Sequence, residues 1–204
     1  MPTACARELC YIKWEDSQKT IVSLINQVGG QAVGLTGKDA GLIEAHKKLI
    51  ANPDKPEELL DLGLVGEVTE FNLNIIYNLL DNDFIPVISP IGFNSLEEET
   101  YNINADLVAG KLAEALQAEK LLLMSNIPGV LDKSGQVLRF LSGDDIAKLI
   151  EDETITGGML PKVASALEAA QNGVGAVHIV DGRVPHCLLL EMLTYQGAGT
   201  VINA

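Results

Sequence analysis

One segment of the sequence combines a pair of glycines with a lysine in a spacing that suits an anionic ligand. In Thr154-Ile155-Thr156-Gly157-Gly158-Met159-Leu160-Pro161-Lys162 the glycines free the backbone, and Pro161 suits the first turn of a helix. Because a helix N-terminus carries partial positive charge and spare N–H donors, Lys162 would strengthen an anion site there. The other interpretation is that the glycines only end a loop and that Lys162 is a surface lysine. The residues alone leave both open.

A second candidate ligand loop is Ser125-Asn126-Ile127-Pro128-Gly129-Val130-Leu131. It follows a run with three consecutive leucines, Lys120 to Met124, which is typical of a parallel strand covered on both faces. Ligands of open α/β sheets bind beyond the carboxyl ends of the strands, where small residues let backbone N–H groups approach a phosphate or a base. The loop matches neither a Walker A motif nor a G-x-G-x-x-G fingerprint. Since a Pro-Gly turn is more often only a turn, the signal is weak by itself.

The third segment, Asn102-Ile103-Asn104-Ala105-Asp106, opens a predicted helix. Asn104 or Asp106 can simply cap that helix, which is a common role for both residue types. With Asn102 and Asp106, however, the segment has more polar side chains than a helix cap needs. An amide at Asn102 could hydrogen-bond a carboxylate or amide ligand, and Asp106 could fix a nearby cationic side chain. Elsewhere the sequence has no Ser/His/Asp or Cys/His arrangement and no metal-ligand spacing, so no metal site is predicted.

The elements that must position these segments follow from hydrophobic periodicity. Strands alternate with helices through short turns, which predicts an α/β fold with a mainly parallel central sheet flanked by helices. The polar, proline-containing stretch 51–58 is predicted to be a connection, and 132–135 a hairpin turn. Helices are expected over 17–28, 72–81, 104–117, 143–151, 161–172 and 185–193, and strands over 31–35, 66–69, 84–89, 120–124, 176–180 and 199–203.

Composition narrows the classes of function. The 204 residues carry 14 Lys and Arg against 28 Asp and Glu, a formal net charge of −14, which argues against non-specific binding to nucleic acid or an anionic membrane. The aromatic content of 4% disfavours stacking platforms for single strands. Cys5, Cys10 and Cys187 lack metal spacing, so reduced thiols in a cytoplasmic protein are expected. The sequence shows neither a signal-peptide pattern nor an apolar run long enough for a membrane helix, which favours the same location.

Taken together, the segments resemble the amino-acid kinase family, and within it the acetylglutamate kinases. Order and spacing agree from about Lys19 to Ile202, and the resemblance implies the family's sandwich of a mainly parallel sheet between helices. The residues that carry it are 32–39 (AVGLTGKD), 66–68 (GEV), 102–106 (NINAD), 127–131 (IPGVL), 156–159 (TGGM) with Lys162, and 178–183 (HIVDGR).

The resemblance implies a reaction in which ATP, carrying Mg²⁺, phosphorylates the γ-carboxylate of N-acetyl-L-glutamate in arginine biosynthesis. Lys162 resembles the lysine that stabilises the transferring phosphoryl group, which phosphoryl transfer needs because its catalysis is mostly electrostatic. Asp106 resembles the aspartate that organises the catalytic lysines, and Asn102 the asparagine that binds acetylglutamate. The nucleotide-binding stretches correspond to Asn126, Ile127, Pro128, Gly129, Val130, Leu131, Thr154, Ile155 and Thr156, where the family usually has Asp in place of Asn126.

The C-terminal part also resembles the arginine-inhibited members of the family. His178, Glu191 and Gly197 resemble positions at which arginine binds, and Glu191 could pair with a guanidinium group. The alternative is that Glu191 is a glutamate on a helix surface.

Several family features are missing from the first part of the sequence. The K-[YF]-G-G loop with a second catalytic lysine, the H-G-G-G loop and a substrate-gripping arginine do not occur. Residues 1–18 are therefore an unmatched segment, 19–101 the remainder of a substrate-binding lobe, and 102–204 a nucleotide-binding lobe, so the fold is expected to be N-terminally incomplete.

Three functional interpretations follow from this pattern. The first is an active kinase, and the second is a catalytically inactive chain that binds nucleotide or arginine. A third, another amino-acid kinase such as a glutamate 5-kinase, is disfavoured by 102–106 together with 178–183. Because a sheet without its leading strands exposes backbone and apolar surface, a homo-oligomer is expected.

Overall fold

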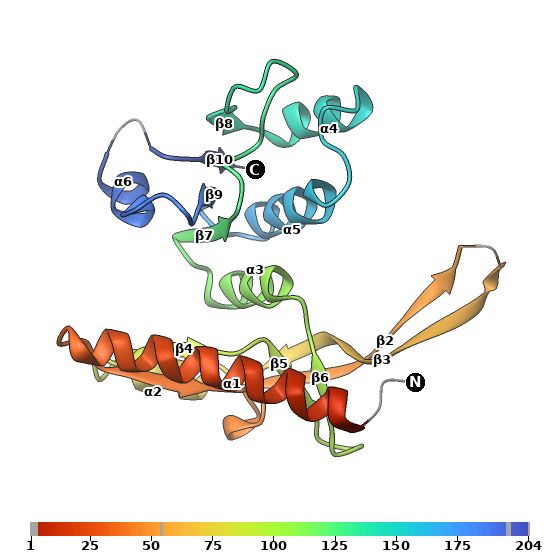
Figure 1. The fold of residues 1–204 in the computed structure, drawn as a ribbon, viewed down its shortest axis with the longest axis vertical. Coiled ribbons are helices and arrows are strands. Elements are labelled where there is room, and N and C mark those ends of the chain that lie inside the picture. Colours follow the sequence, from red (N-terminus) through yellow and green to blue (C-terminus); the bar gives the residue numbers. More distant parts are fainter. Residues whose placement is uncertain (1–3, 54, 195–196, 204) are drawn as a thin grey trace. The chain divides into compact units, whose positions relative to one another are not determined.

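The computed structural model describes residues 4–53, 55–194 and 197–203, with side chains from Asp16 onward. The chain divides into two compact units, Met1–Val108 and Ala109–Ala204, and the ribbon in Figure 1 follows the elements of each. In the described part of the chain, no helix combines the length and the apolar character that crossing a membrane requires.

The first unit contains a short parallel sheet next to its longest helix. Helix α1 spans Ala4–Gln27, so the predicted helix over 17–28 is confirmed and begins earlier than expected. Gly29, with φ of 93°, follows the end of the helix. Strands β1 (Ala32–Leu35) and β4 (Ile85–Ile88) then pair in parallel, and α2 (Asn74–Leu80) precedes β4. The predicted elements over 31–35, 72–81 and 84–89 are therefore confirmed.

The rest of the first unit is a small closed barrel, of which the sequence predicted only the strand over 66–69; that strand is confirmed as part of a longer one. After the short helix η1 (Asp39–Gly41), its strands follow the order β2-β3-β6-β5, and the antiparallel pairs β2–β3 and β5–β6 are joined by parallel contacts. Tyr101 is 1% exposed, and a Cβ on Gly66 would come within 2.5 Å of its Cβ, so glycine is needed there. The strands are β2 (Ile43–Asn52), β3 (Lys55–Phe71), β5 (Ile91–Asn94) and β6 (Glu99–Asn102).

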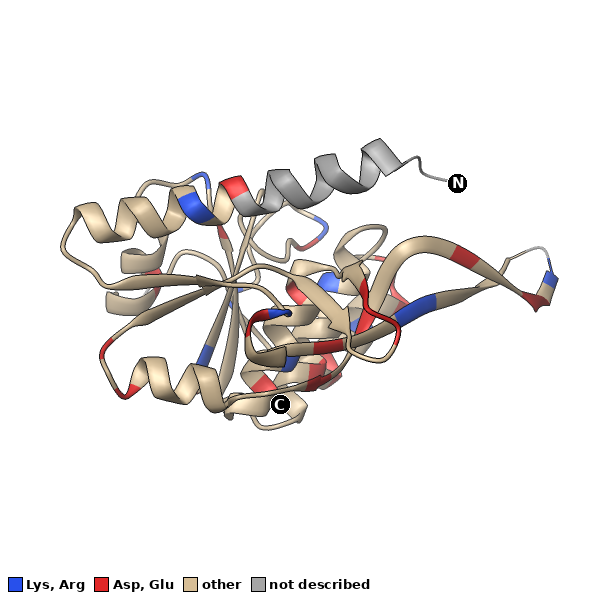
Figure 2. Cartoon of the chain, turned by 90° about the horizontal axis from the view of Figure 1, so that it is seen from below, with Lys and Arg blue, Asp and Glu red and all other residues tan. Residues whose placement is uncertain are grey.

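The predicted connection over 51–58 is wrong for most of its length. Strand β2 continues to Asn52 and β3 begins at Lys55, so only two residues separate the strands of this long hairpin. Acidic and basic residues lie along the hairpin, as Figure 2 shows, and Lys47 forms an ion pair of 3.0 Å with Asp61 across it. The polarity of this stretch therefore reflects strands exposed to solvent rather than a loop.

The second unit is a four-stranded sheet in the order β7-β9-β10-β8. Strands β7 (Lys120–Ser125) and β9 (Ala176–Asp181) pair in parallel, β10 (Thr200–Ile202) is antiparallel to β9, and β8 (Phe140–Leu141) is parallel to β10. The three predicted strands of this region are confirmed, whereas β8 was not predicted. The helices, all of which were predicted, are α3 (Ala105–Leu116), α4 (Gly143–Glu151), α5 (Met159–Gln171) and α6 (Cys187–Leu193).

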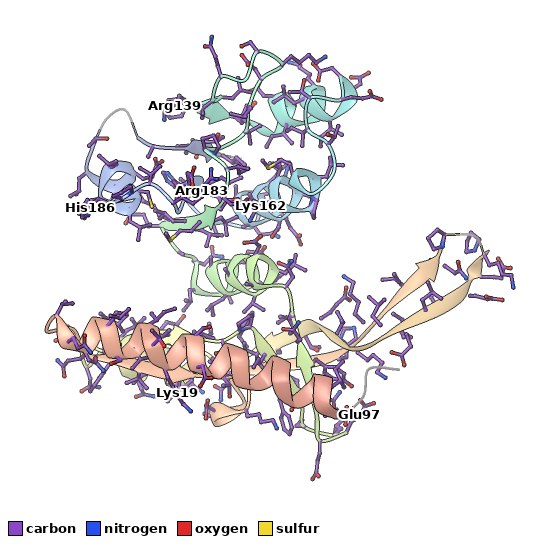
Figure 3. All side chains as sticks on the ribbon, viewed as in Figure 1. Lys19, Glu97, Arg139, Lys162, Arg183 and His186 are labelled. Carbon is purple, nitrogen blue, oxygen red and sulfur yellow. The ribbon has the colours of Figure 1, made fainter. Side chains whose placement is uncertain are left out.

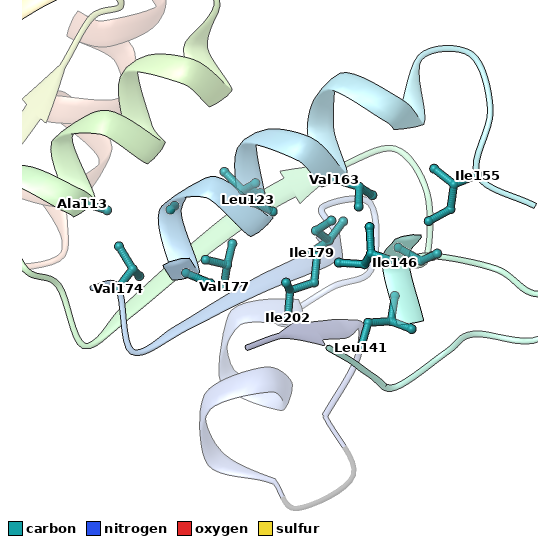
Figure 4. Packing of buried hydrophobic residues seen from close by; sticks show 14 residues of the cluster. Ala113, Leu123, Leu141, Ile146, Ile155, Val163, Val174, Val177, Ile179 and Ile202 are labelled. Atoms are coloured by element: carbon teal, nitrogen blue, oxygen red, sulfur yellow. The ribbon is translucent and has the colours of Figure 1, made fainter. Parts of the chain in front are cut away.

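The core of the second unit centres on β9. Val177, Ile179 and Val180 are completely buried, and β9 has a neighbouring strand on each side. The leucine-rich strand β7 was expected to be covered on both faces, but Met124 is 51% exposed, so one face is only partly covered. Figure 4 shows the cluster that packs around β9, which includes Leu123, Ile146, Val163, Ala166, Ala169 and Ile202.

Replacing Ile179 with Ala should lower the free energy of unfolding by about 2–5 kcal/mol, because the substitution leaves a cavity in this core. Urea unfolding followed by circular dichroism measures the change. The matched control is Ile150→Ala, since Ile150 is 42% exposed on α4 and its loss should change stability by no more than about 0.5 kcal/mol. Equal effects of the two substitutions would contradict the assignment of the core.

Candidate nucleotide and substrate sites

The polar segment 102–106 joins the barrel to helix α3 within the first unit. Asn104 accepts hydrogen bonds through its Oδ1 from the backbone N–H groups of Asp106, at 2.9 Å, and Leu107, at 3.3 Å. Asn104 is therefore the residue that caps α3, which decides between the two capping candidates. Asp106 lies in the first turn of α3, where a carboxylate is favoured by the helix dipole.

Asn102 is the last residue of β6 and has neighbours in two other strands. It pairs with Ile91 of β5 and with Val65 of β3, so the barrel fixes its backbone from both sides. The residue is exposed, although Tyr101 and Ile103 on either side of it are buried. Asn102 therefore offers an amide to solvent from a well-anchored position, which suits the binding of a small polar ligand.

In the second unit, the carboxyl ends of β7 and β9 lie side by side. Ser125 is in register with Asp181, and the Gly182 N–H donates to the Ser125 carbonyl at 2.8 Å. The Asp181 carboxylate accepts hydrogen bonds from Arg183 Nε at 2.9 Å and Nη2 at 2.8 Å. These bonds from Arg183 lower the pKa of Asp181 to about 2, so the pair is charged at neutral pH. Asp181 was not predicted as a site residue. The polar run Asp181-Gly182-Arg183, directly after a predicted strand, is the sequence feature that could have indicated it.

The loop from Asn126 to Leu131 begins at this same edge of the sheet. Asn126 is exposed and Ile127 and Pro128 are half-buried, whereas Gly129 and Val130 are buried. Beyond the loop, the Asp132 carboxylate accepts from the N–H groups of Ser134 and Gln136, so the predicted hairpin turn is confirmed. Only the first half of the loop therefore presents side chains to a ligand, and the second half is anchored inside the unit.

The glycine pair and Lys162 lie at the start of α5. Gly157 and Gly158 have no neighbouring atom within 4 Å of an added Cβ, so the space in front of them is open. The N-cap residue of α5 is Gly158, which has no side chain to accept a hydrogen bond from the first N–H groups of the helix. Lys162, labelled in Figure 3, is half-buried in the first turn of α5. The N–H groups of Met159 and Leu160 already donate to the Thr156 and Gly157 carbonyls, so what suits a phosphate group here is the open backbone at the two glycines together with the lysine.

The stretch Thr154–Thr156 leads into this helix start. Ile155 is 2% exposed and belongs to the core cluster, and its N–H donates to the Leu149 carbonyl at 2.9 Å. The Asp152 carboxylate accepts hydrogen bonds from the Thr154 N–H and hydroxyl. Of the three residues predicted to bind nucleotide here, only Thr156 is exposed, and the other two anchor the loop.

His178, Glu191 and Gly197 are brought together by the folding of the second unit. His178 Nδ1 lies 2.6 Å from Glu191 Oε1, and Glu191 Oε2 accepts from the backbone N–H groups of Ala198, at 2.5 Å, and Gly199, at 3.1 Å. Gly197 has φ of 61°, and an added Cβ would lie 2.9 Å from Glu191 Oε2. The alternative that Glu191 lies on a helix surface is wrong, because its side chain is only 2% exposed.

The buried carboxylate of Glu191 is kept ionised by its partners. Burial raises its pKa, but the hydrogen bonds from Ala198, His178 and Gly199 outweigh burial, so the pKa of Glu191 is lower than its usual value of 4.5. His178 Nε2 is also buried, and it has no hydrogen-bond partner among the described residues.

Sequence comparison places the chain in a family of known proteins. Residues 17–181 match the profile of the amino acid kinase family. Since this range covers most of the chain, the chain belongs to the amino acid kinase family.

Individual relatives and solved structures support the same family. The acetylglutamate kinase of Bordetella avium (strain 197N) is 63% identical over 187 residues, which are 92% of this chain and 62% of the relative. A Streptococcus mutans UA159 structure, smu.665, shares 33% identity with a TM-score of 0.71, covering 91% of this chain and 66% of that one. An N-acetylglutamate synthase of Neisseria gonorrhoeae, complexed with coenzyme A and L-arginine, shares 25% identity with a TM-score of 0.70, covering 85% and 38%. The chain therefore spans about 62% of the length of the curated relatives it matches.

Replacing Glu191 with Gln should destabilise the second unit in a pH-dependent way. Because the folded-state pKa of Glu191 is lowered, its ionised form stabilises the fold above about pH 4.5, and this contribution is lost as the pH falls through the lower, folded value. We expect the variant to lose about 1.5–3 kcal/mol at pH 7, with the difference from wild type shrinking below pH 4.5. Urea unfolding at several pH values measures this.

The control for this experiment is Glu151→Gln, because Glu151 is exposed at the end of α4. It should reproduce the wild-type profile. A Glu191→Gln profile that runs parallel to wild type at every pH would contradict the role given to the carboxylate.

Proposed function

We propose that the chain functions in an acetylglutamate kinase, which transfers the γ-phosphoryl group of ATP to the γ-carboxylate of N-acetyl-L-glutamate. The products are ADP and an acyl phosphate, and the reaction belongs to arginine biosynthesis. The observation that carries this proposal is the 63% identity, over 92% of the chain, to a protein named acetylglutamate kinase. The amino acid kinase family match and the geometry of the two candidate sites support it.

In this proposal the second unit binds ATP. The open backbone at Gly157 and Gly158 lets phosphate oxygens approach the start of α5. Lys162 then supplies positive charge where the transferring phosphoryl group accumulates negative charge. Asn126 and Thr156, both exposed, contact the nucleotide from the two loops. The remaining residues of these loops, buried or half-buried, hold the loops in shape.

Mg²⁺ is proposed to enter with ATP and to be bound mainly by the phosphates, as is usual for this ion. Among the described residues, no group of three or more His, Cys, Asp or Glu side chains is arranged to hold a metal ion. The contribution of this chain is thus the cationic and backbone environment of the phosphates.

The first unit is proposed to bind N-acetyl-L-glutamate through Asn102. An exposed amide can donate to a carboxylate and accept from an amide N–H, so it matches both kinds of polar group in this substrate, its two carboxylates and its amide. Asp106 is proposed to orient a catalytic ammonium group, the role that its motif implies. The capping bonds of Asn104 leave Asn102 available for this purpose.

A second candidate function is a catalytically inactive chain that binds nucleotide or arginine. For arginine, the proposed site is the cluster of His178, Glu191 and Gly197. The similarity to a synthase of Neisseria gonorrhoeae whose solved structure holds L-arginine supports arginine as a ligand. In an active kinase, by contrast, arginine bound at this cluster would act as an inhibitor.

The protein is further proposed to be a cytoplasmic homo-oligomer. Ile21 and Leu24 on α1 and Val28 directly after it are 48%, 57% and 86% exposed, which is an apolar surface that a second copy would cover. A biosynthetic kinase that consumes ATP fits the cytoplasm.

The experiment that tests the proposed function is measurement of ADP formation by the purified chain with MgATP and N-acetyl-L-glutamate. ADP formation that depends on N-acetyl-L-glutamate supports the kinase. Binding of MgATP without turnover supports the inactive alternative, and absence of both contradicts the nucleotide assignment of the second unit.

The same measurement with Lys162→Ala should give turnover lower by about 10²–10³-fold, since the variant loses positive charge at the transferring group. Binding of ADP, measured by calorimetry, should also weaken. Lys120→Ala is the matched control, because Lys120 is exposed at the opposite, amino end of β7 and should leave both quantities unchanged. Unchanged ADP binding and turnover in Lys162→Ala would count against the site.

Substitution of Asn102 with Ala should weaken binding of N-acetyl-L-glutamate about tenfold, because it removes a hydrogen-bonding amide. Asn104→Ala serves as the comparison. It removes the cap of α3 and should cost about 1 kcal/mol of stability while affecting substrate binding less. Calorimetric titration and urea unfolding separate the two effects. Equal binding losses in both variants would show that Asn102 has no direct role.

A further inference from the structure

The hydroxyl group of Thr200 lies between two backbone segments that would otherwise bond directly. The Leu138 N–H donates to the Val130 carbonyl at 2.8 Å, as in an antiparallel pair. The reciprocal bond is replaced by two others: the Val130 N–H donates to Thr200 Oγ1 at 2.8 Å, and Thr200 Oγ1 donates to the Leu138 carbonyl at 2.7 Å. Thr200 is completely buried, so its hydroxyl satisfies two backbone groups that have little access to water.

Gly129, the residue before Val130, fits closely against the same hydroxyl. Its φ is 140°, and an added Cβ would lie 2.6 Å from Thr200 Oγ1 and 3.0 Å from Val137 Cγ1. Only glycine allows the backbone to approach the threonine this closely. The second half of the loop from Asn126 to Leu131 is thus shaped around one side chain of β10.

Thr200 is itself held firmly in place. It is the first residue of β10, which pairs with β9 on one side and β8 on the other. The preceding residue, Gly199, donates its N–H to the buried carboxylate of Glu191. A β-branched side chain also has restricted rotation about its first bond. The hydroxyl is therefore a fixed point to which the loop is attached.

We propose that Thr200 is a positioning residue, which fixes the loop from Asn126 to Val130 in the shape that binds the nucleotide. This proposal rests on the nucleotide-binding role proposed above. Asn126 emerges at the carboxyl end of β7, and the loop is fastened again four residues later at Val130. Loss of the hydroxyl leaves the Val130 N–H and the Leu138 carbonyl without this partner, so the loop no longer has one preferred position.

The test compares Thr200→Val, which removes the hydroxyl, with Thr200→Ser, which keeps it. Hydrogen exchange at the Val130 amide reports on the loop in the ligand-free chain, and calorimetry with MgATP reports on binding. We expect Thr200→Val to raise the exchange rate of Val130 and the Kd for MgATP about tenfold each. Thr200→Ser should stay within about twofold of wild type in both, and exchange at Ile179 in the core should not change in either variant.

Binding of N-acetyl-L-glutamate should be the same in both variants, which separates a local effect on the loop from general unfolding. Wild-type affinity for MgATP in Thr200→Val would overturn the proposal, whatever the exchange at Val130. If Thr200→Val does not fold, Gly129→Ala tests the same contact from the loop side, and wild-type MgATP affinity there would overturn the proposal too.

Failure of the underlying function can be told apart from failure of this inference. A wild-type chain that binds no MgATP contradicts the nucleotide assignment. Exchange at Val130 in the ligand-free variants then decides by itself whether Thr200 holds the loop: faster exchange in Thr200→Val alone supports it, and equal exchange in all variants overturns it.

Discussion

The parallel pairing of β7 with β9 is the contact on which the second unit depends. This pairing satisfies backbone hydrogen bonds of β9, in which Val177, Ile179 and Val180 are completely buried. The same pairing brings the carboxyl ends of both strands to one edge, where the loops after Ser125 and Asp181 begin. The helices pack against this sheet, and α5 supplies Lys162 from its first turn. The register of β7 against β9 therefore determines both how the core packs and where the two loops of the candidate site begin.

Much of the second unit could be predicted because its elements show clear periodicity. The first unit was harder, since the barrel strands β5 and β6 are only four residues long and the arms of β2 and β3 are polar. The residues of the candidate site likewise differ in whether the sequence could predict them. Asn102, Asp106 and Lys162 lie in recognisable motifs, whereas the burial of Glu191 depends on contacts with His178, Ala198 and Gly199 that only the folded chain makes. The contacts of Thr200 join residues 70 and 62 positions apart, which no local pattern reveals.

The last part of the chain matters more to the structure than the family match suggests. The match ends at residue 181, but the residues after it form α6 and β10. Ile202 is completely buried in the core cluster, and Cys187 and Glu191 of α6 are also buried. These residues add a strand to the sheet and enclose the carboxylate of Glu191. The C-terminal segment is thus an integral part of the second unit rather than an extension of it.

The boundary between the two units falls inside α3, between Val108 and Ala109. Most domain boundaries lie in loops, where the backbone can be cut without loss of hydrogen bonds. Here a cut would break a helix in the middle and expose the backbone groups of at least one turn on each side. The halves are therefore poor candidates for separate expression, circular permutation or gene fission at this point. A break in the reading frame at this point would therefore disrupt both units, which ties them to one continuous chain.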